Sequence, residues 1–122
     1  MTPLIYGLLY SSESEFPWIL DDLGNKKPEE IQVLISARHN NEAAVEVEAD
    51  AFFNRYIQNR IIGGNEVSLA EAGRYTQLHH FLKTNAAAIS VWRCGRIQVG
   101  IYILITTKKG QTLMLRTTAI ET

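Results

Sequence analysis

Ile97-Gln-Val-Gly-Ile-Tyr-Ile-Leu-Ile105 is the stretch that decides the fold, because an apolar side chain recurs at every second position without a break. This period of two predicts a β-strand that turns one face toward a core. Tyr102 and Leu104 lie on the opposite face, which indicates that the second face is covered as well. The turn sequence Lys108-Lys-Gly110 and the strand-like Thr112–Ile120 that follows it predict a hairpin with a returning strand.

A second hairpin is predicted nearer the N-terminus. Ile31–Arg38 alternates well enough for a strand, and Asn40-Asn41 is typical of a turn. Ala44–Glu48 would then be the partner strand, with Val45 and Val47 facing inward.

Three helices are expected around these strands. Leu4–Leu9 carries the apolar spacing of one face of a short helix. Asp50 is placed to cap a short helix that carries the following Phe-Phe pair, because its carboxylate can accept from free N–H groups of the first turn. Ser68 and Glu71 have the spacing of a capping box before a longer helix.

The stretches between these elements have the composition of loops. Ser11–Glu15, Asp21–Glu30 and Ile57–Glu66 are rich in Ser, Gly, Asn or charged residues and lack a clear period. The whole pattern predicts an α+β fold in which helices pack on an antiparallel sheet. A chain of 122 residues supports one core, so we expect a single domain over residues 1–122.

Composition is that of an ordinary globular protein. Apolar residues make up 46% and charged residues 20%, which excludes global disorder. The single cysteine, Cys94, excludes an intramolecular disulfide and fits a reducing compartment. The apolar runs are too short for a membrane-spanning helix, and residues 1–9 lack the basic start of a secretory signal. These features predict a soluble, cytoplasmic protein with no membrane partner.

The formal net charge of −1 conceals two halves of opposite sign. Residues 1–50 carry ten acidic and three basic side chains (−7), and residues 51–122 carry three acidic and nine basic ones (+6). Such a dipole would steer a charged partner, unless the two halves fold together and their charges interleave. The near-neutral total disfavours a general nucleic-acid binder, so we expect no direct nucleic-acid partner.

The residues that could support catalysis do not form a recognisable set. His79 and His80 are adjacent on a helix and point about 100° apart, which suits surface histidines better than a shared metal. Cys94 is interpreted as a buried small residue. Gly63-Gly64 lacks the Lys-Ser/Thr of a phosphate-binding loop. The sequence therefore predicts no enzymatic activity, no cofactor and no metal site of its own.

Three motifs carry a resemblance to a known family. Gly7-Leu-Leu-Tyr-Ser-Ser-Glu-Ser-Glu-Phe-Pro17 resembles the signature string of the nuclease A inhibitor family, small bacterial proteins that block a metal-dependent, sugar-non-specific nuclease. Asp50-x-Phe-Phe-x-Arg55 is similar to a second family motif. Val91-x-Arg93-x-Gly95 and the strands that run from it to Glu121-Thr122 match a third region.

The resemblance implies an α-β-α sandwich with a mainly antiparallel sheet and helices on its faces. It also implies an inhibitor that presents Glu13 to cationic residues of the nuclease and Thr122 toward the Mg²⁺ of the nuclease. A carboxylate can imitate the phosphodiester anion that such an active site binds, and a hard cation prefers oxygen ligands. The partner-binding residues that it implies are Glu13 with its neighbours Ser12, Ser14 and Glu15, then Ile61 and Ile62, then Glu121 and Thr122.

A second function is compatible with the same residues. A protein of this fold could instead bind a different protein partner or a small ligand, again without catalysis. A nuclease partner would favour inhibition, whereas a deep apolar pocket with converging polar groups would favour ligand binding.

Overall fold

The apolar strand quoted above is the centre of a five-stranded antiparallel sheet in the computed structural model, which describes residues 1–121. In spatial order the strands are β3 (Ile19–Gly24), β7 (Thr112–Ile120), β6 (Gln98–Thr107), β5 (Ala86–Cys94) and β4 (Val45–Val47). A separate two-stranded hairpin is formed by β1 (Leu9–Ser11) and β2 (Glu15–Pro17). The expected hairpin of residues 97–120 is confirmed.

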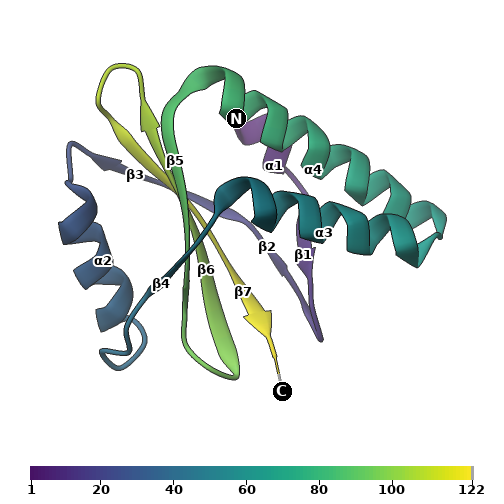
Figure 1. Ribbon diagram of the computed structural model, residues 1–122, viewed down its shortest axis with the longest axis horizontal. Coiled ribbons are helices and arrows are strands. Elements are labelled where there is room, and N and C mark those ends of the chain that lie inside the picture. Colours follow the sequence, from purple (N-terminus) through teal and green to yellow (C-terminus); the bar gives the residue numbers. More distant parts are fainter. Residues whose placement is uncertain (122) are drawn as a thin grey trace.

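Helices lie on both faces of this sheet (Figure 1). One face is covered by α1 (Thr2–Ile5), α3 (Ala49–Gly63) and α4 (Glu66–Asn85), and the other by α2 (Pro28–Ala37). The architecture is therefore an α+β fold, as the sequence pattern predicted, with the α-β-α sandwich that the family resemblance implied. Among the described residues, no helix is long and apolar enough to cross a membrane.

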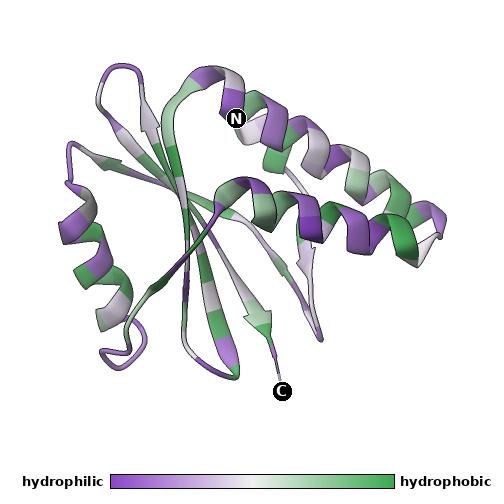
Figure 2. Ribbon diagram, viewed as in Figure 1, coloured by the Kyte–Doolittle hydropathy of each residue, from purple (hydrophilic) through white to green (hydrophobic). Residues whose placement is uncertain are grey.

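The strand β6 divides two hydrophobic cores. Ile101, Ile103 and Ile105 pack into the larger core beneath α3 and α4, and each is at most 2% exposed. Tyr102 and Leu104 pack into the smaller core beneath α2. Both faces of β6 are thus covered, which confirms the expectation drawn from Leu104. In Figure 2 the hydrophobic colour runs along the central strands between the helical layers.

The segment expected as a strand over residues 31–38 is a helix instead. Ile31 and Ile35 are each 1% exposed and lie one helical turn apart, whereas Val33 is 68% exposed. Pro28 occupies the start of α2 and acidic residues fill its first turn, both of which favour a helix N-terminus. The expected second hairpin is therefore wrong, and β4 pairs with β5 in the register Val45↔Arg93.

The orientation expected for β4 is also wrong at one position. Val45 is 62% exposed rather than inward, whereas Val47 is partly buried against the larger core. A three-residue strand at the edge of the sheet has few neighbours. The alternation of apolar and polar residues along it therefore does not determine which side chains are buried.

The stretch expected as a loop over residues 57–66 is largely helical. The helix α3 continues to Gly63 and ends at Gly64, whose left-handed φ of 74° suits glycine at a helix C-terminus. Its N-cap is Glu48, which accepts from the backbone N–H groups of Asp50 and Ala51, so the cap expected at Asp50 is wrong by two residues.

The cap expected for α4 is likewise displaced. Asn65 is the N-cap and accepts from the Ser68 backbone N–H at 2.8 Å, so Ser68 and Glu71 do not form the expected box. Ser68 is instead fully buried within the helix.

Two further boundaries differ from expectation. The first helix ends at Ile5, and Leu9 opens β1 rather than continuing a helix. Asp21 and Asp22, expected in a loop, belong to β3 and pair with β7.

Replacing the central isoleucine of β6 should test the two-sided core. We expect Ile103→Ala to lower the free energy of unfolding by about 2–5 kcal/mol, because the side chain is fully buried. Ile97→Ala, at a 62% exposed position just before the same strand, should change it by less than about 0.5 kcal/mol. Urea denaturation of both variants measures the difference, and equal losses would contradict the assignment of the core.

Candidate functional site

The site begins with the tip of the β1–β2 hairpin, which consists of Ser12, Glu13 and Ser14. Ser11 pairs with Glu15 at the mouth of the turn, and Ser12 N–H donates to the Ser14 carbonyl at 2.8 Å. The Ser12 hydroxyl donates to the same carbonyl at 3.1 Å. All three tip side chains and Glu15 are exposed. The residues expected as a loop thus form a tight, hydrogen-bonded turn with Glu13 in the middle.

The tip is bonded directly to the end of β7. Ile120 N–H donates to the Ser12 hydroxyl oxygen at 2.9 Å, and Glu13 N–H donates to the Ile120 carbonyl at 3.3 Å. The next residue, Glu121, donates its N–H to the Ile97 carbonyl at 2.9 Å. Residues 12–14 and 121, which lie far apart in the sequence, therefore share one surface. Thr122 lies outside the described residues.

The end of β1 beside the hairpin tip is held to the helical layer through Tyr56. Its hydroxyl accepts from Ser11 N–H at 2.8 Å and donates to the Glu71 carboxylate on α4. Arg60 places its Nε 3.1 Å from the same carboxylate. Burial and the hydrogen bond to Glu71 raise the pKa of Tyr56 to about 12. Tyr56 therefore remains a neutral donor throughout the physiological range.

A second anchor lies next to the first, because the Tyr75 ring is 4.5 Å from that of Tyr56. The Trp18 indole N–H donates to the Tyr75 hydroxyl at 2.7 Å, and that hydroxyl donates to the Leu9 carbonyl at 2.7 Å. Tyr75 is fully buried, and burial raises the pKa of its hydroxyl far above the ordinary value. Tyr10, between these anchors, stacks on Tyr56 with ring centroids 4.6 Å apart. The hairpin is thus rigidly held although its tip is exposed.

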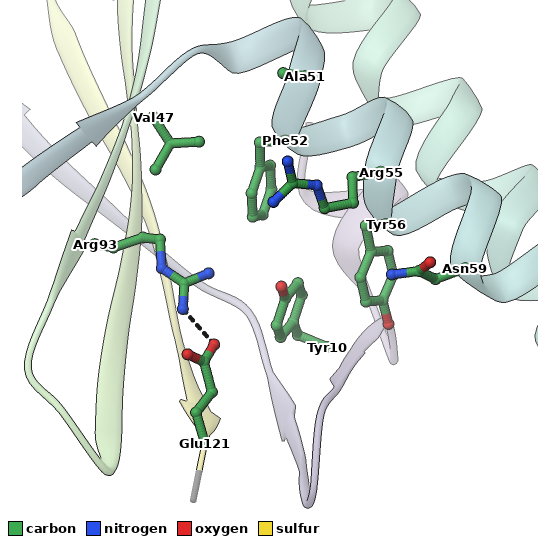
Figure 3. A pocket seen from close by; sticks show the side chains of 9 residues that line it. All are labelled: Tyr10, Val47, Ala51, Phe52, Arg55, Tyr56, Asn59, Arg93 and Glu121. Atoms are coloured by element: carbon green, nitrogen blue, oxygen red, sulfur yellow. Dashed lines mark hydrogen bonds and ion pairs between the residues drawn. The ribbon is translucent and has the colours of Figure 1, made fainter.

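A cavity of about 410 Å³ lies beside the hairpin, between α3 and the edge of the sheet (Figure 3). The rings of Tyr10, Phe52 and Tyr56 form one part of its lining. Arg55 on α3 and Arg93 on β5 approach it from different sides. The lining also includes Val47, Ala51, Asn59 and Glu121. The cavity is therefore mixed in character, with cationic groups over an aromatic wall.

Arg93 is the charged neighbour of Glu121. Its Nη2 forms an ion pair with Glu121 Oε2, drawn as the dashed line in Figure 3. Burial raises the pKa of the Tyr10 hydroxyl, and the nearby guanidinium of Arg93 partly offsets this effect. Sequence reasoning assigned no role to Arg93, because its partner lies 28 residues away.

Ile61 and Ile62 lie at the other end of the helical layer. They occupy the last turn of α3 and are 44% and 79% exposed. Figure 1 places the end of α3 and the hairpin tip at separate corners of the molecule, and Figure 2 shows that this last turn is hydrophobic. The sequence-predicted residues therefore form two exposed areas, one acidic and one apolar, rather than a single cluster.

His79 and Cys94 have structural roles. His79 lies 2.8 Å from the Asp50 carboxylate and stacks on Phe53, and its hydrogen bond lowers the pKa of Asp50. Cys94 is 2% exposed, and burial raises the pKa of its thiol. No group of three or more His, Cys, Asp or Glu side chains within residues 1–121 could hold a metal ion.

Comparison with known families identifies the family of the chain. The family model described as nuclease A inhibitor-like protein matches residues 1–122, the whole chain. The chain belongs to the nuclease A inhibitor-like family. No curated protein matches the sequence. Family membership supports the role of a nuclease inhibitor in general, and a nuclease is the protein partner that such a role requires.

Removing the hydroxyl of Tyr56 should loosen the end of β1 beside the hairpin tip. We expect Tyr56→Phe to lower the free energy of unfolding at pH 7 by about 1–2 kcal/mol, because Ser11 N–H and Glu71 lose a buried partner. Tyr6→Phe, at an 83% exposed position, should have no effect.

The same variant should reveal the raised pKa. The folded protein holds the Tyr56 proton to about pH 12, whereas the unfolded chain releases it near the ordinary value of 10.0. The contribution of Tyr56 to stability is thus complete below pH 10 and is lost as the pH rises toward 12. Chemical denaturation from pH 8 to 11 should show the gap between wild type and Tyr56→Phe narrowing above pH 10. A constant gap would contradict this assignment.

Proposed function

We propose that residues 1–122 act as one inhibitor domain that occupies the active site of a metal-dependent, sugar-non-specific nuclease in the bacterial cytoplasm, without catalysis of its own. The observation that carries the proposal is the bonded joint between the hairpin tip and the end of β7. This joint brings Glu13 and Glu121, two of the three acidic residues of the proposed site, onto one surface.

The acidic hairpin tip suits a site that binds phosphodiesters. A nuclease holds its substrate anion between cationic groups, and the exposed carboxylate of Glu13 can take the place of that anion. Because the turn is already fixed by its own hydrogen bonds and by Ser12 to Ile120, little conformational freedom is lost on binding. Ser12, Ser14 and Glu15 would supply polar contacts around Glu13.

Thr122 is proposed to complete the acidic area. In a chain that ends at this residue, the terminal carboxylate and the threonine hydroxyl offer oxygen ligands toward the Mg²⁺ of the nuclease. Support comes from the preceding residues, because the backbones of Ile120 and Glu121 are held by the hairpin tip and by Ile97.

The exposed end of α3 is proposed as the second contact area. Ile61 and Ile62 present apolar surface that a partner would remove from water, and such burial stabilises a complex in proportion to area. An acidic contact for orientation and an apolar contact for affinity would then act at two corners of the same protein.

One observation favours a different function for the same fold. The cavity of about 410 Å³ beside Arg55 and Arg93 is large enough for a small ligand. The nuclease proposal is stronger because it uses the hairpin, the chain end and the family assignment together.

The proposal is tested by titration against a sugar-non-specific nuclease that is captured on this protein from its native extract. Inhibition should be complete at one inhibitor per nuclease. Absence of inhibition by the intact protein would favour the alternative.

Glu13→Ala should weaken inhibition without affecting the fold. We expect the inhibition constant to rise by the equivalent of about 2 kcal/mol or more, as for a charged group buried at the centre of an interface. Thermal stability should hardly change, because the side chain is exposed in the free protein. Glu30→Ala, an exposed acid on α2, is the matched control and should inhibit like wild type. Equal inhibition by the two variants would remove Glu13 from the site.

A short extension after Thr122 should weaken inhibition strongly. It would displace the carboxylate proposed to face Mg²⁺ and add bulk beside the hairpin tip. The same extension before Met1, near α1 on the helical layer, should have a much smaller effect. Inhibition titrations of both versions, with melting temperatures compared first, measure this. Full inhibition by the C-terminally extended protein would exclude a metal-directed role for Thr122.

A further inference from the structure

Two arginines belong to the family-like motifs but have no role yet in the proposed inhibition. Arg55 closes one motif and Arg93 lies in another, and both line the cavity beside the hairpin (Figure 3). They differ in their partners. Arg93 is paired with Glu121, whereas no ion pair of Arg55 occurs within the described part of the chain.

The Arg93–Glu121 pair connects two strands that are not neighbours. Arg93 lies on β5, Glu121 follows β7, and β6 runs between them. The backbone N–H groups of residues 120 and 121 already donate to the Ser12 hydroxyl and to the Ile97 carbonyl. They fix the main chain only, and the ion pair is the contact that fixes the direction of the Glu121 side chain.

We infer that Arg93 is a positioning residue for inhibition: it holds Glu121 so that the acidic area is preformed beside Glu13. The inference rests on the proposed function. A glutamate side chain in solution samples many rotamers, and ordering it on binding costs free energy. An arginine that orders the side chain beforehand moves this cost from the binding step to the free protein.

The exposure of the Arg93 and Glu121 side chains distinguishes a positioning role from a role in the stability of the fold. The side chains of Arg93 and Glu121 are 32% and 45% exposed, and ion pairs at such positions contribute little to folding. Loss of Arg93 should therefore leave the melting temperature nearly unchanged while it weakens inhibition. A structural residue would show the opposite pattern.

The first experiment compares arginine variants in the inhibition titration. Arg93→Ala should weaken inhibition about tenfold, and Arg93→Lys, which keeps the charge, should restore most of the loss. The matched control is Arg116→Ala, which removes the ion pair of Arg116 with Asp21, at 35% and 29% exposure on the same sheet. This control should inhibit like wild type. Unchanged inhibition by Arg93→Ala would overturn the inference.

The second experiment shows whether Arg93 acts through Glu121. In a double-mutant cycle, Arg93→Ala should cost about tenfold in the wild-type background and almost nothing in Glu121→Ala. An equal loss in both backgrounds would mean that Arg93 contacts the nuclease directly and would overturn the positioning role.

If wild type itself fails to inhibit, the proposed function fails. Side-chain order of Glu121, followed by NMR in the free protein, should still fall in Arg93→Ala, and unchanged order would overturn the inference by itself.

Discussion

The need to cover both faces of β6 constrains the rest of the molecule. An antiparallel sheet commonly leaves one face to solvent. Here the residues from Val99 to Ile105 are all buried, so neither face can be exposed without bringing apolar side chains into water. The larger core takes α3 and α4, and the smaller core takes α2. The three-layer architecture follows from the composition of this one strand.

The same constraint determines where the acidic area lies. A slip of one residue between β6 and β7 would send every side chain of β7 to the opposite face, so the register is strongly specified. In that register Gln98 is opposite Ile120, and the next residue, Glu121, reaches the Ile97 carbonyl. The position of Glu121 beside the hairpin tip is therefore a consequence of core packing. Changes deep in the core would alter the site even though they touch none of its residues.

The sequence allowed the strands of residues 97–120 to be predicted because their period was long and unbroken. The strand predicted at α2 is wrong because the sequence there fits both periods. Ile31, Val33 and Ile35 have the alternating spacing of a strand, whereas Ile31 and Ile35 have the four-residue spacing of one helix face. β-branched residues favoured the strand, although Pro28 and the acidic residues after it are local signals of a helix start. Packing of Ile31 and Ile35 against the second face of β6 decides for the helix. The end of α3 was missed because Gly63-Gly64 indicates a loop, whereas the contact of Arg60 with Glu71 holds that turn against α4.

The candidate site likewise contains residues that could be predicted from the sequence and residues that could not. Glu13 was found because it lies in a continuous string that resembles a family signature. Tyr56 and Arg93 were not assigned roles, because each acts on a residue distant in the sequence, 15 positions away at Glu71 and 28 at Glu121. Tertiary contacts of this kind leave no pattern in the local sequence, even though Arg93 lies in a family-like motif. Only the fold reveals them.

The fold also resolves the opposite charges of the two halves of the sequence. Within residues 1–121, three ion pairs join an acid of the first half to a base of the second, namely Asp21 with Arg116, Glu42 with Arg96, and Asp50 with Lys83. These contacts interleave the charges, as one of the two interpretations required. With a formal net charge of −1, the protein also has little net charge to steer a partner over a long range. Recognition by the proposed site must then depend on short-range contacts of a preformed acidic tip, for which the rigidity of the hairpin matters more than net charge.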